Sequence, residues 1–188
     1  MIKLEKMSNK QPELDLIAEW RNQTLISLRS SDLTAKGDSQ TKWVNGFVSS
    51  EKYYFIYSPE LPSHNAQGYA LTKLLGYCGL DKIDHVNRTA EMGLLIDPEY
   101  HKQGYGSAAI NALLELAFLG FNLNLIFIEV ITSTKNIDFW IKQGFRTEGY
   151  LKERHFKNGK YYDSHITSII KNEWEATQRD SKLLKGLS

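Results

Sequence analysis

The chain has 188 residues, of which 41% are hydrophobic and 24% charged, a composition that suits one globular domain with a sizeable core. Basic and acidic residues number 23 and 22, so no overall field recruits nucleic acid or an anionic membrane. The single cysteine, Cys78, excludes an intramolecular disulfide. Because no apolar run approaches the roughly 18 residues of a membrane span and no secretory leader opens the chain, we expect a cytoplasmic protein with neither nucleic acid nor membrane as partner.

The first half alternates patterns typical of strands and helices. Apolar residues recur at helical spacing in "QPELDLIAEWRN", and Asp38 or Ser39 is suited to cap a second helix. Aromatic residues crowd "KYYFIYS", whereas chain breakers occupy both ends of "LPSHNAQGYAL". The predicted elements are a strand at residues 1–7, helices at 11–22 and 38–50, a strand at 52–58 and a loop at 61–71.

The second half continues the alternation. An Asn-Gly pair within "KNGK" indicates the turn of a hairpin, and residues 175–188 form a polar, basic tail that we expect to be a solvated or frayed helix. The element order predicts an α/β fold with a mixed sheet and helices on both faces. The elements are strands at 73–83 and 88–96 that form a hairpin around "DHVN", a helix at 106–121, a strand at 125–131, a short helix at 136–143 and a hairpin turning at 157–160.

A polar loop with two closely spaced glycines, Gly104 and Gly106, precedes the long helix. The first N–H groups of a helix have no internal partner and its dipole favours negative charge there, so such a turn suits a phosphate. Glycine also lets the backbone approach an anion closely. A purely structural role, turning the chain and capping the helix, is the alternative.

The same glycines fit the dinucleotide fingerprint G-x-G-x-x-A, and Glu129 stands near the position of its ribose-binding acid. That fingerprint requires the first glycine to follow its strand directly, but the polar stretch "DPEYHKQ" intervenes. A hairpin rather than further βαβ units follows Gly144. Both points disfavour a dinucleotide site.

A second phosphate motif fits better. Residues His101 to Gly106 match Arg/Gln-x-x-Gly-x-Gly/Ala, except that a histidine replaces the usual Arg or Gln. In this motif the chain resembles the GCN5-related N-acetyltransferases, the GNAT family, whose loop wraps the pyrophosphate of acetyl-CoA. Other stretches match in order and spacing, and resemble the branch of ribosomal-protein and amino-sugar N-acetyltransferases. They are "WRNQ", "LRSSDLT", "SQTKW", "AEMGLLIDPEY" and "FWIKQGFRTEGYLKERHFKNGKYYDSHITSIIKNEW".

The resemblance implies one GNAT domain at residues 1–174 followed by the tail at 175–188. It implies a mostly antiparallel sheet whose strands at 91–96 and 125–131 splay apart, with acetyl-CoA as co-substrate and no metal. Ser133 stands at the spacing of the family's CoA-contacting asparagine and Asn136 three residues on, so either is open for that contact. The implied CoA-binding residues are Leu94, Leu95, Ile96, His101, Lys102, Gln103, Gly104, Tyr105, Gly106, Ser107, Asn136 and Trp140.

Direct attack by an amine requires that the ammonium lose a proton and that charge on the thioester oxygen be stabilised. Glu129 is one candidate base, because its neighbours Ile128 and Val130 are apolar and a carboxylate in such a strand is costly unless paired or functional. A rim carboxylate paired with Arg or Lys is the alternative. Glu91 is a second candidate, as base or as an anchor for the substrate ammonium. His85 is a third, unless it is simply exposed in its predicted turn.

The residue at the position of the family's general acid, which protonates the leaving thiolate, departs from the family pattern. Many members carry a tyrosine in Tyr-x-Lys-x-Gly-Phe that protonates the leaving thiolate, and Trp140 occupies that position here. An indole N–H donates a hydrogen bond but is not a useful acid. We therefore expect the thiolate to leave unassisted or with help from water.

The resemblance implies a primary amine as acceptor: a protein N-terminus, an amino sugar or, thirdly, a small free amine or antibiotic. Arg21, Arg29 and Arg154 are candidates for binding an anionic group on it, although each also suits a surface ion pair. The expected partners are this acceptor and, in a possible homodimer, a second copy. Because Trp140 and His101 differ from the residues usual in the family's motifs, a non-catalytic acyl-CoA sensor or scaffold is the alternative function.

Overall fold

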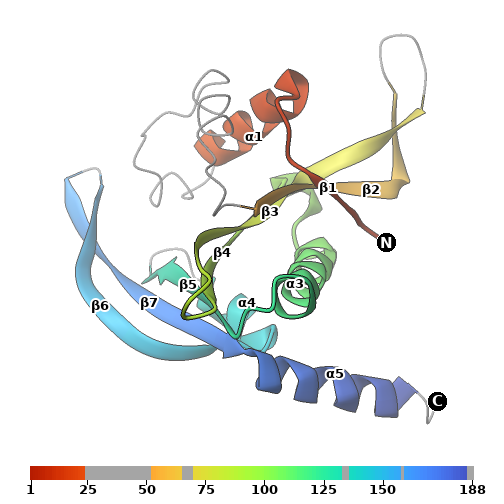
Figure 1. Ribbon diagram of the computed structural model, residues 1–188. Coiled ribbons are helices and arrows are strands. Elements are labelled where there is room, and N and C mark those ends of the chain that lie inside the picture. Colours follow the sequence, from red (N-terminus) through yellow and green to blue (C-terminus); the bar gives the residue numbers. More distant parts are fainter. Residues whose placement is uncertain (24–51, 65–69, 133–135, 158, 186–188) are drawn as a thin grey trace. The chain divides into compact units, whose positions relative to one another are not determined.

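The computed structural model describes residues 1–23, 52–64, 70–132, 136–157 and 159–185 (Figure 1). The second predicted helix, at 38–50, lies outside these ranges. The chain forms two compact units, one of residues 1–82 and 92–115 and the other of residues 83–91 and 116–188. The strands form a seven-stranded sheet in the order β1-β2-β3-β4-β5-β7-β6. The predicted α/β class with a mixed, mostly antiparallel sheet is confirmed.

Four strands and two α-helices make up most of the first unit. β1 and β2 pair antiparallel, with Lys3 opposite Tyr57, and β2 pairs antiparallel with β3. Figure 1 shows α1 and α3 on opposite sides of these strands, as expected for helices on both faces. The elements are β1 (Lys3–Lys6), α1 (Gln11–Gln23), β2 (Lys52–His64), β3 (Ala70–Asp84), β4 (Thr89–Ile96), a 3₁₀ turn (Pro98–Tyr100) and α3 (Tyr105–Glu115); the ends of β3 and β4 that face each other across the turn belong to the second unit.

The predicted loop at 61–71 is wrong at both ends, because β2 continues to His64 and β3 begins at Ala70. The pairing of the two strands is irregular between Ser58 and Pro62 and then resumes, with Pro62 opposite Thr72. A bulge accommodates a proline that cannot donate to a regular ladder. Pro62, one of the breakers that indicated a loop, therefore lies at this irregularity, and residues 65–69 of the predicted loop lie outside the described part of the chain.

The core of the first unit follows the two periodicities of its elements. Every second residue of β2 faces α1, so Tyr53, Phe55 and Tyr57 pack with Leu14 and Ile17. Both aliphatic side chains are fully buried, and each contributes about 1.5–3 kcal/mol to folding. The same core includes Leu74 of β3 and Leu95 of β4, the strand that precedes the glycine loop. The residues of α3 that are buried are Ala109, Ile110, Leu113 and Leu114.

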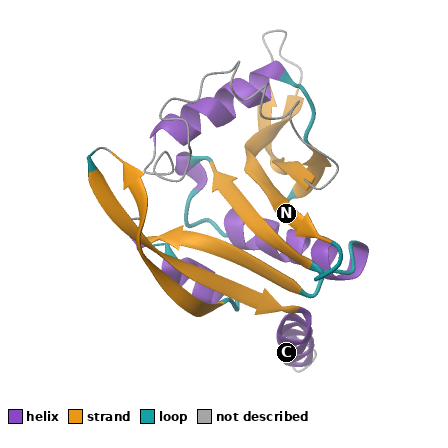
Figure 2. Cartoon of the chain, turned by 60° about the vertical axis from the view of Figure 1, so that its left-hand side comes forward, coloured by secondary structure: helices purple, strands orange, loops and turns teal. Residues whose placement is uncertain are grey.

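The second unit contains β5, β6 and β7. β5 runs parallel to the start of β4 over three pairs, from Thr89 opposite Leu125 to Glu91 opposite Phe127, and antiparallel to β7. So short a parallel ladder agrees with the expected splaying of these strands. The elements are a π-helical turn (Leu116–Gly120), β5 (Leu125–Ile131), α4 (Ile137–Lys142), β6 (Arg146–Lys157), β7 (Lys160–Ile170) and α5 (Lys171–Lys185) (Figure 2).

The helix predicted at 106–121 is confirmed in extent, although its last part widens into a π turn that closes with Phe121 N–H donating to the Leu116 carbonyl at 2.9 Å. The predicted short helix and final hairpin are also present. The expected helical tail begins earlier than residue 175, because α5 starts at Lys171. Within that helix Trp174 is buried and its ring lies 5.4 Å from that of Phe118.

Candidate active site

The glycine loop is anchored at the end of β4 by Asp97. Its N–H donates to the Leu75 carbonyl at 2.8 Å, and its buried carboxylate accepts from the Glu99 N–H at 3.0 Å. This side chain caps the 3₁₀ turn that starts with Pro98. The bond to β3 and the cap together hold the loop in a fixed position relative to the strands of the first unit.

Two loop side chains fold back onto the backbone instead of reaching outward. The Nε2 atom of His101 lies 2.9 Å from the Ile96 carbonyl oxygen, and the Gln103 amide donates to the Glu99 carbonyl at 3.0 Å. Since a carbonyl only accepts, Nε2 of His101 carries the proton. The histidine that replaces the family's Arg or Gln thus shapes the loop, and an anion here would be bound by backbone N–H groups.

Two residues of the loop have positive φ values, and three N–H groups precede the first internal bond of α3. Lys102 and Gly104 have φ values of +60° and +86°, in the left-handed region that favours glycine. The N–H of Ala108 donates to the Gly104 carbonyl at 3.0 Å. The three preceding N–H groups, of Tyr105, Gly106 and Ser107, therefore lie before the first intrahelical bond of α3. This arrangement fits a pyrophosphate.

The strand before the loop contains a close contact that the sequence did not reveal. A Cβ atom added at Gly76 of β3 would lie 2.0 Å from the carbonyl oxygen of Leu95, so only glycine permits this approach of the two strands. Leu95 and Ile96 are buried and Leu94 is partly exposed. An isolated glycine inside a strand pattern was the available signal.

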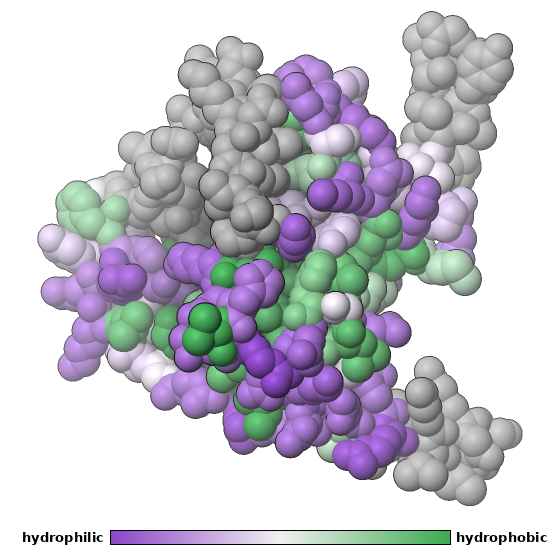
Figure 3. All heavy atoms as spheres, viewed as in Figure 1, coloured by the Kyte–Doolittle hydropathy of each residue, from purple (hydrophilic) through white to green (hydrophobic). Residues whose placement is uncertain are grey.

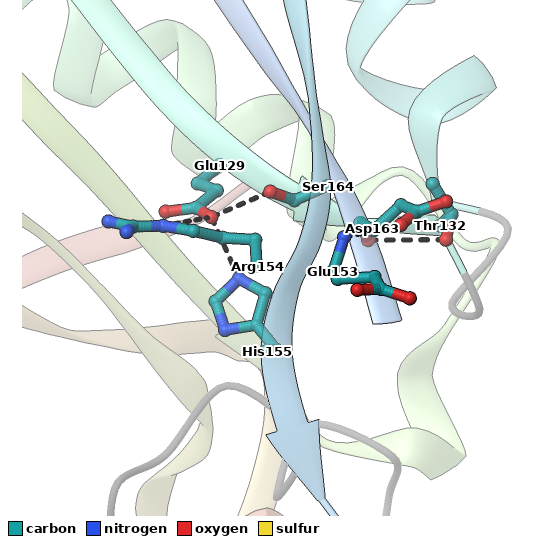
Figure 4. A network of polar contacts seen from close by, with 7 residues as sticks. All are labelled: Glu129, Thr132, Glu153, Arg154, His155, Asp163 and Ser164. Carbon is teal, nitrogen blue, oxygen red and sulfur yellow. Dashed lines mark hydrogen bonds and ion pairs between the residues drawn. The ribbon is translucent and has the colours of Figure 1, made fainter. Parts of the chain in front are cut away.

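The second group of candidate residues is centred on Glu129 of β5 (Figure 4). Its Oε1 atom accepts from the Ser164 hydroxyl at 2.7 Å and lies 2.7 Å from Nε2 of His155. The Nε atom of Arg154 is 3.6 Å from the same oxygen. The Glu129 side chain is only 14% exposed, against 59% for Arg154. Sequence reasoning named the glutamate and the arginine but missed His155 and Ser164.

These contacts set the charge of Glu129. Partial burial alone raises the pKa of its carboxyl, but the hydrogen bonds from Ser164 and His155 and the charges of His155 and Arg154 outweigh burial. The pKa of Glu129 is therefore lower than its ordinary value. The carboxylate is an anion near neutral pH, and its own affinity for a proton is reduced.

An irregularity in β6 brings Arg154 and His155 to this carboxylate. Pairing between β6 and β7 shifts register between Leu151 and His155, and Glu153 has a φ of +49°. Asp163 of β7 holds the irregular segment, since Oδ1 accepts from the Glu153 N–H at 2.6 Å and Oδ2 accepts from the Tyr150 hydroxyl. Both contacts lower the pKa of Asp163, the Tyr150 hydroxyl contributing most.

The remaining candidates have more varied positions. Glu91 is buried, with 5% exposure, opposite Phe127 in the parallel ladder. Arg21 lies in the last turn of α1, whereas Arg29 and Ser133 fall outside the described residues. His85 is exposed in the turn between β3 and β4, where the Asp84 carboxylate accepts from two backbone N–H groups. The third candidate base therefore matches its alternative, an exposed turn residue.

Asn136 directly precedes α4, and Trp140 lies within it. The indole of Trp140 is buried and packs edge-on against Phe145, with ring centroids 5.3 Å apart. This gives the residue a packing role, and its contact with CoA stays a prediction. Asn136 is the exposed first residue before the helix, and its side chain makes no capping hydrogen bond.

Within the ranges that the structure describes, no helix has the length and apolar character needed to cross a membrane. The same residues contain no group of three or more His, Cys, Asp or Glu side chains that could hold a metal ion. The face drawn in Figure 3 shows both hydrophilic and apolar side chains, as is usual for a globular protein.

Known proteins resemble this chain in sequence and fold. A spermidine N(1)-acetyltransferase of Vibrio cholerae is 31% identical over 106 residues, 56% of this chain and 61% of that protein. A putative ribosomal N-acetyltransferase of Bacillus subtilis is 33% identical over 103 residues, 54% of this chain and 56% of that protein. The match thus spans less than two thirds of either relative's length.

The crystal structure of a spermidine N-acetyltransferase from Vibrio cholerae in complex with CoA and spermine has a TM-score of 0.75 at 24% identity, covering 92% of this chain and 97% of that one. This likeness confirms the expected fold. The Acetyltransferase (GNAT) family model matches residues 22–145, more than half of the sequence and including the glycine loop. The chain belongs to the GNAT acetyltransferase family.

Proposed function

We propose that this protein is an acetyl-CoA-dependent N-acetyltransferase that acts on a primary amine by direct attack. The start of α3 carries the proposal, because the N–H groups of Tyr105, Gly106 and Ser107 precede its first internal bond and fit the pyrophosphate of CoA. Bound acetyl-CoA supplies the thioester carbon that a neutral amine attacks. The domain at residues 1–174 is proposed to act as one functional unit.

The predicted CoA contacts divide into two kinds. His101 and Gln103 shape the loop through their bonds to backbone carbonyls, while the exposed Lys102 is suited to pair with a phosphate. Backbone groups of Leu94, Leu95 and Ile96 are proposed to pair with the pantetheine arm. The Ile96 carbonyl already accepts from His101, so its second lone pair would serve. Asn136, whose amide does not cap α4, remains a proposed contact, as does Trp140.

The proposed acceptor is a primary amine of a protein N-terminus or an amino sugar. The names of the relatives add spermidine, a polyamine, and ribosomal protein as acceptors to test. Arg154, with 59% exposure, and Arg21 are proposed to bind an anionic group on the acceptor. Glu129 and Glu91 are proposed to serve proton transfer or to anchor the ammonium.

The non-catalytic alternative has one observation in its favour. Trp140 packs in the core at the position of the family's acidic tyrosine, so the usual proton donor to the thiolate is replaced. A CoA sensor would keep the loop and tolerate the loss of Glu129 and Glu91.

Thiol release from acetyl-CoA, measured with a panel of N-terminal peptides, amino-sugar nucleotides, polyamines and aminoglycosides, separates the two functions. Acceleration by one class, reduced in Glu129→Gln or Glu91→Gln, supports the enzyme and identifies its acceptor. If the protein binds CoA but no class accelerates thiol release, the sensor is favoured.

A further inference from the structure

Resting on the proposed function, we infer that His101 takes up a proton when the diphosphate of CoA binds, so that the affinity of the glycine loop for CoA rises as pH falls. His101, the end of β4 and the start of α3 all lie in the first unit. The family's motif usually has Arg here, which is always charged, or Gln, which is always neutral. A histidine can adopt either state near neutral pH.

One hydrogen bond determines where the proton can add. Nε2 of His101 lies 2.9 Å from the Ile96 carbonyl oxygen, and because that oxygen only accepts, Nε2 carries the proton of the neutral ring. Nδ1 then has the lone pair. The side chain is exposed, so a proton from solvent can form an Nδ1–H bond. Since an imidazolium donates from both nitrogens, the bond to Ile96 is kept in either charge state.

The position of His101 in the loop keeps its charge close to the expected phosphates. Three peptide units separate His101 from Gly104, so their Cα atoms lie at most ~11 Å apart. Lys102, between them, has a φ of +60°, which turns the chain instead of extending it. The Debye length is about 10 Å in 0.1 M salt. A charge on the ring therefore acts on an anion held by the N–H groups that follow Gly104.

The charged groups around His101 leave its imidazolium available to such an anion. His101 makes no ion pair in the part of the chain that the structure describes. The carboxylate of Asp97 accepts from the Glu99 N–H, and Lys73 of β3 lies over an aromatic ring of the 3₁₀ turn, 5.5 Å from its centroid. The charged and titratable groups of the loop and of the neighbouring β3 segment are Lys73, Asp97, Glu99, Tyr100, Lys102 and Tyr105.

Thermodynamic linkage gives the direction of the effect. A bound diphosphate brings two negative charges, which stabilise the imidazolium through space. By reciprocity, the imidazolium raises the affinity for the diphosphate by the same factor. Affinity is therefore highest where the ring is charged in both the free and the bound protein, and lowest where it is neutral in both. Net proton uptake is confined to the range between, at about pH 6–7.

Dephospho-CoA is the probe of choice for the test. The 3′-phosphate of CoA changes its own charge near pH ~6, whereas the diphosphate of dephospho-CoA keeps its two charges. Calorimetry at about pH 6.5, in two buffers that differ in ionisation enthalpy, counts the protons taken up on binding. The wild type should take up a fraction of a proton. At low salt its Kd should be about threefold or more lower at about pH 5.5 than at about pH 8, and this difference should shrink in about 0.5 M salt.

Two variants separate the charge of His101 from its structural role. His101→Gln keeps an N–H donor for the Ile96 carbonyl but cannot be charged, and His101→Arg keeps a donor and is charged throughout. Both should bind dephospho-CoA without proton uptake and with the same Kd at the two pH values, and His101→Arg should bind more tightly. His85→Gln, which removes an exposed histidine from the turn between β3 and β4, should take up as much as the wild type.

The outcomes distinguish the inference from the proposed function. Proton uptake that persists in His101→Gln and His101→Arg, or a wild-type Kd that does not change with pH, would overturn the inference and leave the proposed function intact. A wild-type protein that binds neither CoA nor dephospho-CoA would instead overturn the proposed function, and the inference with it.

Discussion

Gly76 offers a test of how closely β3 approaches β4, the strand that is proposed to pair with the pantetheine arm of CoA. In Gly76→Ala the new Cβ would lie 2.0 Å from the Leu95 carbonyl oxygen, 2.9 Å from its carbonyl carbon and 3.0 Å from the Ile96 Cα. All three atoms belong to the backbone, so no side-chain rotation relieves the contact. A carbon–oxygen contact requires roughly 3.3 Å, and β4 would therefore have to move by more than about 1 Å.

Overpacking of this kind costs about 1–3 kcal/mol, and the φ of +153° at Gly76 adds strain of about 1 kcal/mol or more for an alanine. At about 2–4 °C per kcal/mol for a chain of this length, a total near 3 kcal/mol lowers Tm by about 6–12 °C. Since Leu95 is a proposed partner of the pantetheine arm, the KM for acetyl-CoA should also rise.

Gly93 provides the control, because it lies on the neighbouring strand β4 and a Cβ there would meet no atom within 4 Å. Thermal unfolding of the wild type, Gly76→Ala and Gly93→Ala, followed by circular dichroism, compares them directly. Gly93→Ala should unfold within about 2 °C of the wild type. Equal melting of all three proteins would show that β3 and β4 do not approach as closely as the structure has them.

Two further predictions concern the glycine loop and the carboxylate of Glu129. Gly104→Val places a β-branched side chain at a φ of +86° and should weaken CoA binding about tenfold or more. The control Gly159→Val changes a glycine with a φ of +75° and equally open surroundings in the β6–β7 turn, and it should leave CoA binding unchanged. Equal CoA affinities of the two variants in calorimetry would contradict the phosphate assignment. Because the pKa of Glu129 is lowered in the folded state, its stabilising contribution is present above the ordinary carboxyl pKa and is lost as pH falls through the folded value. The Tm difference between wild type and Glu129→Gln should therefore shrink between pH 7 and pH 3, and a constant difference would refute the pairing.

Sequence patterns predicted the fold well where an element is regular. A run rich in aromatic residues located the first part of β2, and apolar residues at helical spacing located α3. The prediction of a loop failed at residues 61–64 and 70–71, because Pro62 lies at an irregularity after which β2 and β3 go on pairing. Local composition cannot distinguish a loop from an interrupted strand, because the pairing partner that resumes the ladder lies elsewhere in the chain.

The same distinction separates the two candidate sites. The glycine loop is a contiguous motif, so its residues and its helix could be predicted together. The other site brings Glu129 together with His155, which lies 26 positions further along the chain, and with Ser164, which lies 35 positions further along. Their meeting depends on a register shift in β6, and no spacing rule in the sequence encodes where such a shift falls.

The structure also changes the choice that the sequence posed for Glu129, between a general base and a rim carboxylate in an ion pair. The Nε atom of Arg154 lies 3.6 Å from Oε1 of Glu129, as the ion-pair alternative requires, and the same oxygen also accepts from the Ser164 hydroxyl and contacts His155. Because these contacts lower the pKa of the Glu129 carboxyl, they favour its anion and reduce the affinity for a proton that a general base requires.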